Sequence, residues 1–235
     1  MSIRFVVRAA LVAGLPLLLA LPAGAQTPNS GLTGVALVQR AEHRLRYLGS
    51  VHEQSGLWFG GEGLASFGRV RLRVSGVTGR LSGDTSVTNP DRSVRVSEAS
   101  LSLQPFGWLE FGTDVVARRV ASRASTVVSR LLGGHVGVAV PLGVEGLTGA
   151  VRGVYCPATD VTGDEALSLA LGGEIGVLYA PSRSGIVLRL SYRFERYDYA
   201  AGALGPARLE QVRAVVVALG IHREREPATS RASPR

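Results

Sequence analysis

Strict alternation of apolar and polar residues is the feature that most constrains this chain. The stretch from Arg69 to Val74, RVRLRV, places an arginine at every second position and an aliphatic residue after each one. Because successive side chains of a β-strand point to opposite faces, one face of this stretch is cationic and the other is apolar. Such a strand needs a polar environment on one side and an apolar one on the other.

The same period-two pattern recurs in ten segments. Their approximate bounds are 36–48, 55–67, 69–81, 92–104, 107–118, 126–140, 144–156, 166–180, 185–199 and 208–222. Every segment is longer than the roughly 5 or 6 residues of an ordinary strand and exceeds the roughly 9 to 11 that a tilted membrane strand needs. The lengths favour strands that cross a membrane.

The connections between the segments alternate between short and long. The short joints are Gly68, Pro105-Phe106, 141–143 and 181–184, and the longer polar joins read GSVHEQ, SGDTSVTNPD, RVASRAS, PATDVTGDE and AAGALGPA. In a closed up-and-down barrel, successive turns emerge at opposite ends. The alternation therefore predicts a barrel whose two ends face different solvents.

This pattern resembles the bacterial outer-membrane β-barrel superfamily, in which short periplasmic turns alternate with longer external loops and the strand number is even. The resemblance covers residues 36–222. It implies an all-β, antiparallel, up-and-down transmembrane β-barrel of about ten strands, with eight as the alternative, located in the cell outer membrane.

The last segment, EQVRAVVVALGIH, is ambiguous. It lacks the final aromatic residue that outer-membrane barrels usually carry, and Leu209, Val212, Val216 and Leu219 would share one face of a helix. A helix would leave nine strands, so the even strand count favours a strand.

Three regions follow from these patterns. Residues 1–25 are expected to be a secretory signal peptide, with Arg4 and Arg8 before an apolar stretch and Ala23-Gly24-Ala25 at the cleavage site. Residues 26–222 form the barrel domain, and residues 223–235 a charged, disordered tail. The single cysteine, Cys156, excludes an intramolecular disulfide.

The charge of the chain narrows its expected partners. All 26 basic residues are arginine, and removal of Arg4 and Arg8 with the signal lowers the formal charge from +8 to +6. A basic chain can bind nucleic acid, but an exported protein is separated from the nucleic acid inside the cell. No nucleic-acid partner is therefore expected. The expected partners are outer-membrane lipid, lipopolysaccharide and the barrel assembly machinery. The protein is expected to be a monomer and to carry no cofactor.

The assignment of faces predicts a charged lumen. In segment 185–199, Leu188 and Leu190 suit lipid, and Arg189 and Arg193 point inward. An arginine facing lipid at the midplane would cost roughly 2 to 4 kcal/mol, whereas an inward guanidinium can pair with a carboxylate. The expected lumen network comprises Arg40, Glu42, Arg44, Arg46, Glu62, Arg69, Arg71, Arg73, Glu110, Asp114, Arg152, Glu174, Arg189, Arg193 and Glu195.

Aromatic residues are expected near both ends of the barrel, as interfacial girdles. Phe67, Phe106 and Tyr179 fall at the short-turn end, and Tyr47, Tyr155 and Tyr199 at the long-loop end.

Motifs for chemistry are sparse. No GxSxG, HExxH, CxxC or P-loop signature occurs. His52-Glu53 with Asp84 and Asp91 could form an acid–base group at the loop rim, where ten-stranded outer-membrane proteases of the omptin type carry Asp and His.

Other candidates have plainer interpretations. Asp160, Asp164 and Glu165 offer oxygen ligands for calcium, but their spacing matches no EF-hand. We interpret His135 as a core histidine and Cys156 as a small packing residue.

The sequence thus predicts a non-enzymatic outer-membrane β-barrel with a packed, arginine-rich lumen and a structural, surface or narrow-passage role. Two alternatives stay open: an outer-membrane hydrolase with a site at the loop rim, and a secreted soluble β-barrel that binds a ligand.

Overall fold

The computed structural model describes residues 30–83, 91–122, 126–161, 167–181, 184–201 and 206–225. These residues form ten strands: β1 (Ser30–Tyr47), β2 (Ser50–Phe67), β3 (Val70–Gly83), β4 (Arg92–Phe106), β5 (Leu109–Ala121), β6 (Thr126–Pro141), β7 (Leu147–Val161), β8 (Leu167–Tyr179), β9 (Ile186–Tyr199) and β10 (Arg208–Arg225). No helix in this part of the chain is long and apolar enough to span a membrane.

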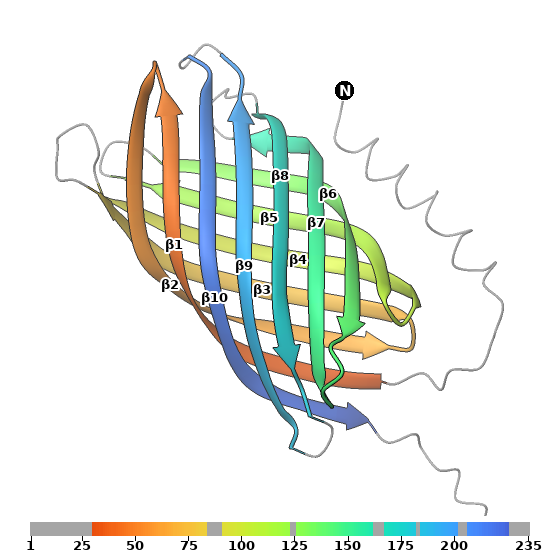
Figure 1. Ribbon diagram of the computed structural model, residues 1–235. Coiled ribbons are helices and arrows are strands. Elements are labelled where there is room, and N and C mark those ends of the chain that lie inside the picture. Colours follow the sequence, from red (N-terminus) through yellow and green to blue (C-terminus); the bar gives the residue numbers. More distant parts are fainter. Residues whose placement is uncertain are drawn as a thin grey trace, which may run out of the picture.

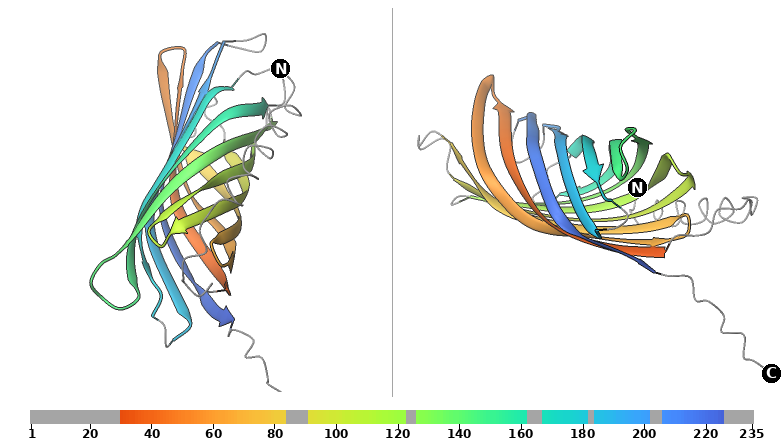
Figure 2. Two further views of the ribbon diagram at one scale, coloured as in Figure 1. Left: turned by 90° about the vertical axis from the view of Figure 1, so that its right-hand side faces the viewer. Right: turned by 60° about the horizontal axis from the view of Figure 1, so that its bottom comes forward.

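The ten strands close into one antiparallel barrel in which each strand pairs with its neighbours in sequence. β1 closes the barrel against β10, with Ser30 opposite Arg225 and Tyr47 opposite Arg208. Figures 1 and 2 show these tilted strands wrapping around a single lumen. The predicted ten-stranded up-and-down barrel is confirmed, and the helical alternative for the last segment is wrong because that segment supplies the closing strand.

The barrel begins earlier and ends later than the ten predicted segments, which ran from residue 36 to residue 222. β10 runs on to Arg225, so residues 223–225 belong to the barrel and not to a tail. The predicted signal peptide (1–25) and the rest of the predicted tail (226–235) lie outside the described residues.

The connections fall at two ends. Both termini of the barrel and the even-to-odd connections, such as β2–β3, lie at one end, here called the termini end; the odd-to-even connections, such as β1–β2, lie at the loop end. The predicted alternation of turn lengths is wrong at several connections. At the loop end, only Leu48 and Gly49 join β1 to β2, and residues 122–125 join β5 to β6. At the termini end, the β6–β7 connection spans residues 142–146 and the β8–β9 connection residues 180–185.

The β1–β2 turn explains the first exception. Leu48 and Gly49 both have positive φ angles, 49° and 79°. Positive φ at both central residues is the geometry of the tight type I′ hairpin, whose twist matches that of the flanking strands. The residues SVHEQ therefore continue the ladder as part of β2, although their polarity had predicted a loop.

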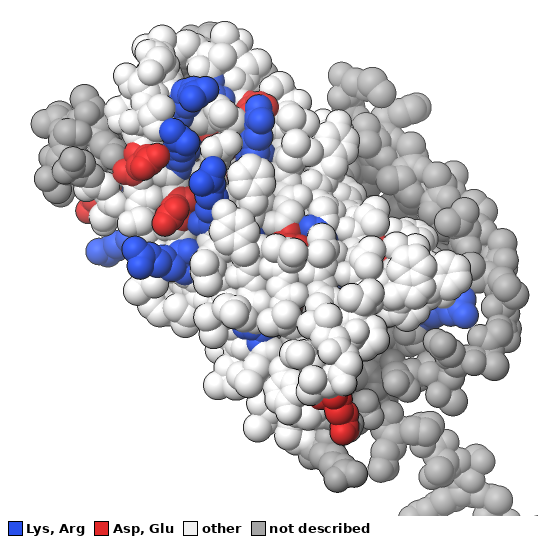
Figure 3. Space-filling view, in the orientation of Figure 1, with Lys and Arg blue, Asp and Glu red and all other residues white. Residues whose placement is uncertain are grey.

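The outer face carries an apolar band. Exposed aliphatic and aromatic side chains cover the outside of the strands, for example Leu188, Leu190 and Tyr192 on β9 and Val215, Val217 and Leu219 on β10. An exposed surface of this kind is far larger than a soluble monomer normally presents. Space-filling representation shows an uncharged belt below a charged upper region (Figure 3).

At the loop end the polarity of the faces is reversed. There the lumen holds a cluster of buried apolar side chains that includes Leu37, Trp58, Leu81, Val94 and Val96. Trp58 packs opposite Gly79, where a β-carbon would collide with the indole ring. The loop-end half thus resembles a soluble barrel, with a mainly apolar core inside and charged residues outside.

Candidate functional site: the charged lumen

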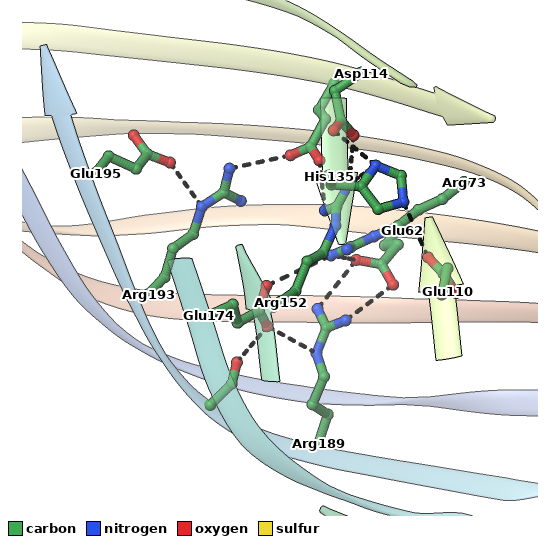
Figure 4. A network of polar contacts seen from close by, with 12 residues as sticks. Glu62, Arg73, Glu110, Asp114, His135, Arg152, Glu174, Arg189, Arg193 and Glu195 are labelled. Carbon is green, nitrogen blue, oxygen red and sulfur yellow. Dashed lines mark hydrogen bonds and ion pairs between the residues drawn. The ribbon is translucent and has the colours of Figure 1, made fainter. Parts of the chain in front are cut away.

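A network of arginines and carboxylates crosses the lumen below this apolar cluster. Figure 4 shows side chains from β2, β3, β5, β6, β7, β8 and β9 pointing toward one another. The predicted lumen residues that the structure brings together are Glu62, Arg71, Arg73, Glu110, Asp114, Arg152, Glu174, Arg189, Arg193 and Glu195.

One cluster is centred on Glu62 of β2. Its carboxylate accepts hydrogen bonds from Arg189 at 2.9 and 3.1 Å and from Arg73 at 2.7 Å. Glu174 lies 3.8 Å from Arg73 and accepts a hydrogen bond from Ser191. Because β2 and β9 are separated by β1 and β10, the Glu62–Arg189 pair bridges the lumen.

A second cluster is centred on Glu98 of β4, which is only 4% exposed. It accepts hydrogen bonds from Arg152 of β7 at 2.9 Å and from Arg193 of β9 at 3.0 Å. Arg152 also donates to Asp114, and Arg193 contacts Glu195 at 2.6 Å. One carboxylate therefore ties one wall of the barrel to two strands of the opposite wall.

His135 of β6 links this cluster to the termini end. Its Nδ1 lies 2.8 Å from Asp114 and its Nε2 lies 3.2 Å from Glu110. Glu110 also accepts a hydrogen bond from Arg71 at 3.2 Å. The His135 side chain is fully buried, so the structure places it in the polar core of the lumen.

A third cluster lies at the loop end. Arg118 of β5 donates to Glu210 of β10 at 2.9 Å and stacks over the Tyr197 ring at 4.6 Å. Glu210 is also 3.5 Å from His43 and accepts from Arg208 at 3.3 Å. Burial opposes the negative charge of Glu210, but Arg118 and His43 outweigh it and lower the pKa of that carboxyl. Burial likewise lowers the pKa of His43, despite the nearby carboxylate.

Four predicted lumen residues lie on the wrong face. Arg40, Glu42, Arg44 and Arg46 all point outward from β1, and Leu37, Gln39, Ala41 and His43 point inward. The physical reason is that this half of β1 lies at the loop end, where the outside is polar and the inside is an apolar core. The same inversion buries Tyr199, which we had placed in an aromatic girdle, beneath Arg208 at 4.0 Å.

Arg69 also differs from the prediction. It lies in the β2–β3 turn, where its carbonyl accepts the amide of Gln104. It makes none of the ion pairs found among the described lumen residues.

The sequence reasoning missed Glu98, Arg118, His43 and Glu210. A signal for Arg118 was present, because it shares its strand face with Glu110, eight residues earlier, and Asp114, four residues earlier. Glu98 shares a face with Ser100 and Ser102, a weaker signal, because short hydroxyls also occur on outer faces.

The open space in the lumen is uneven. A cavity of about 530 Å³ lies at the termini end, between the Glu62 and Arg73 side chains, Trp108 and the β8–β9 connection at Pro181. Beside Arg152, Arg193 and Glu195 the cavity volume is only about 40 Å³. A space of that size holds a few water molecules at most.

The predicted rim chemistry does not assemble in the described residues. His52 and Glu53 are consecutive on β2, so their side chains point to opposite faces. Asp84, Asp164 and Glu165 lie outside the described residues, as does the side chain of Asp160. Across the described ranges, no group of three or more His, Cys, Asp and Glu side chains is placed to hold a metal ion.

Several solved structures of outer-membrane proteins are similar to this one. The sequence matches no protein-family model and no curated protein. The structure is similar to the outer membrane protease OmpT from Escherichia coli, with a TM-score of 0.49 and 7% identity over 87% of this chain and 99% of that chain. It is also similar to Neisserial surface protein A, with a TM-score of 0.33 and 13% identity over 82% of this chain and 97% of that chain.

A third similar structure is Ail, the attachment invasion locus protein of Yersinia pestis, with a TM-score of 0.37 and 10% identity over 82% of this chain and 99% of that chain. These similarities extend over most of the described barrel. The fold of this chain is the closed, ten-stranded antiparallel barrel that its own strand pairing shows.

Proposed function

We propose that this protein is a non-enzymatic outer-membrane barrel whose lumen is closed by its own ion pairs, so that it serves as a structural or surface scaffold. The observation that carries the proposal is the bridging of opposite walls by Glu98, where the adjoining cavity is only about 40 Å³. Barrels of eight strands are just filled by side chains, and those of 16 to 18 hold an aqueous channel. Ten strands lie near the filled limit.

The apolar band supports the membrane location. On β3 the outward residues from Val70 to Thr78 are uncharged, and on β9 those from Ile186 to Phe194 are uncharged. Nine residues of a strand tilted by about 40° span about 23 Å at 3.3 Å per residue, close to the roughly 25 Å apolar band of such barrels. We further propose export by the signal peptide, insertion by the barrel assembly machinery, contact with lipopolysaccharide and a monomeric state.

Planar-bilayer conductance tests the closed lumen. The decisive variant changes Glu98, Arg152 and Arg193 together to serine, which empties the narrow part and removes the carboxylate along with its two guanidiniums. The matched control is Arg71→Ser, because Arg71 lies beside the wide cavity and Glu110 keeps its contact with His135.

We expect the wild type and the control to be nearly silent and the triple variant to conduct. Large, stable channels in the wild type would overturn the closed-lumen proposal and favour a porin-like function. A triple variant that stays silent while folded would place the seal elsewhere.

The two alternatives have separate tests. A rim hydrolase should cleave peptide substrates and lose that activity on His52→Ala; such a result would overturn the non-enzymatic proposal. A secreted soluble barrel should stay in solution without detergent, whereas the exposed band of Leu188, Leu190 and Val217 should require detergent and give heat-modifiable gel migration.

A further inference from the structure

Outward-facing arginines mark one edge of the apolar band. From the apolar band toward the loop end, the first charged outward side chain is an arginine on seven of the ten strands. These residues are Arg40 of β1, Arg80 of β3, Arg95 of β4, Arg119 of β5, Arg130 of β6, Arg196 of β9 and Arg213 of β10. The band therefore ends in a belt of guanidiniums at the loop end.

Ion pairs on the outer face near this belt include Arg44 with Glu53 at 3.3 Å and Arg196 with Asp198 at 2.9 Å. Arg95 and Arg119, in contrast, are direct cross-strand partners on the outer face. Like charges opposite each other in a sheet are destabilising, so an external anion at this level would relieve the repulsion.

The belt forms a groove at the seam where β1 closes against β10. A groove of about 260 Å³ is lined by Arg44, Arg46, Leu209, Gln211 and Arg213. No carboxylate lines it, although Glu53 contacts Arg44 and Glu42 lies opposite Arg213 in the ladder. Figure 3 shows blue side chains gathered over the upper ends of β1, β9 and β10.

The surroundings of the groove indicate the chemistry of its ligand. Guanidiniums bind phosphate oxygens through paired, charge-assisted hydrogen bonds. Directly below the groove, the outer face of the same seam carries Val38, Val215, Val217 and Leu219, all exposed. A ligand that satisfies both surfaces has phosphate groups above acyl chains.

We propose that the seam groove binds the phosphate groups of an outer-leaflet glycolipid of the lipid A type, with the acyl chains lying on the apolar band below. This inference rests on the proposed membrane location. To the proposed membrane location, the inference adds a defined binding site. The site consists of three arginines at the β1–β10 closure, on the loop-end side of the apolar band.

The test compares two variants of equal charge. The seam variant changes Arg44, Arg46 and Arg213 to glutamine; the control variant changes Arg80, Arg95 and Arg119 to glutamine on strands away from the seam. Both lose three outward positive charges. Refolded protein of each kind is titrated with lipid A in detergent micelles, with dephosphorylated lipid A and with inorganic phosphate, and binding is measured by native mass spectrometry and fluorescence.

We expect the seam variant to bind lipid A at least tenfold more weakly than the wild type, and the control variant to lose much less. Dephosphorylated lipid A should bind the wild type weakly, and inorganic phosphate at equal concentration should not compete. Equal losses in both variants would indicate diffuse attraction and overturn the seam site, and unchanged binding in both would do the same. Effective competition by inorganic phosphate would identify a free-anion site instead.

Two further measurements separate this inference from the membrane proposal. Heat-modifiable gel migration of both variants verifies folding, and flotation with phosphatidylcholine vesicles verifies membrane incorporation. If the wild type does not float, the proposed membrane location fails. If it floats and the seam variant still binds lipid A normally, only the seam inference fails.

Discussion

Replacement of Glu98 by glutamine should destabilise the barrel more than any exposed charge change. The side chain of Glu98 is 3% exposed and serves two guanidiniums, those of Arg152 and Arg193. Breaking a buried ion pair on one side typically costs about 3 to 5 kcal/mol because the remaining charge is left in a poorly solvated site.

The expected cost lies at the lower end of that range. Arg152 keeps Asp114, and Arg193 keeps Glu195, so neither guanidinium is left without a carboxylate. We therefore expect a loss of about 3 kcal/mol, or roughly a 150-fold change in the unfolding equilibrium constant at 1.36 kcal/mol per factor of ten.

The measurement is urea unfolding of the refolded protein in phospholipid vesicles, followed by the fluorescence of the buried Trp58. The matched control is Glu53→Gln, because Glu53 also pairs with an arginine, Arg44, but its side chain is 72% exposed. Exposed pairs contribute about 0 to 1 kcal/mol. If Glu98→Gln costs no more than Glu53→Gln, the buried network does not hold the walls together, and the reasoning fails.

Three other outcomes are expected. Val217→Arg should cost about 2 to 4 kcal/mol in the same unfolding assay because it places a charge in the apolar band, whereas Ser82→Arg, above the band and opposite Ser55, should be nearly neutral; equal costs would refute the position of the band. On intact cells, a tag inserted after Gly49 should be accessible to antibody and one after Val144 only after permeabilisation; the reverse pattern would invert the topology. Because the pKa of His43 is lowered, its contribution to stability is complete above the unfolded value of 6.5 and is lost as the pH falls. His43→Gln should therefore flatten the decline in stability between pH 7 and pH 5, and an unchanged slope would contradict this.

The period-two pattern was sufficient to predict the strands and their closure. Segments such as 185–199 alternate so regularly that strand, length and face all followed from the sequence, and the structure places Leu188 outward and Arg189 inward as expected. The parity of the strand number also resolved the last segment correctly, since β10 must return to meet β1.

The same pattern could not indicate which face of β1 points inward. Alternation gives two faces that differ by one residue in register, and the polar face was assumed to line the lumen along the whole strand. In β1 the inward side chains are Leu37, Gln39, Ala41 and His43, and the outward ones are Arg40, Glu42, Arg44 and Arg46. The outer face of the strand changes from apolar to charged along its length, and the inner face changes with it, so one rule cannot serve both halves.

The partners within the lumen were also beyond the sequence. Glu62 and Arg189 are 127 residues apart, and Glu98 and Arg193 are 95 apart. Composition indicated that inward arginines need carboxylates, but which ones they meet depends on the stagger of the strands around the barrel. That stagger is set by turns such as Leu48-Gly49, whose tight geometry the polarity of the neighbouring residues did not reveal.

The sequence by itself determined that the chain makes ten amphipathic strands and closes on itself, because period-two alternation and chain connectivity are local properties. Only the tertiary structure decided where the apolar band ends, which arginines line the lumen and which ring the outside. The reason is physical. Alternation along a strand fixes which side chains share a face, but the surroundings of that face depend on the position of each residue along the barrel axis. That position follows from the tilt and closure of all ten strands together.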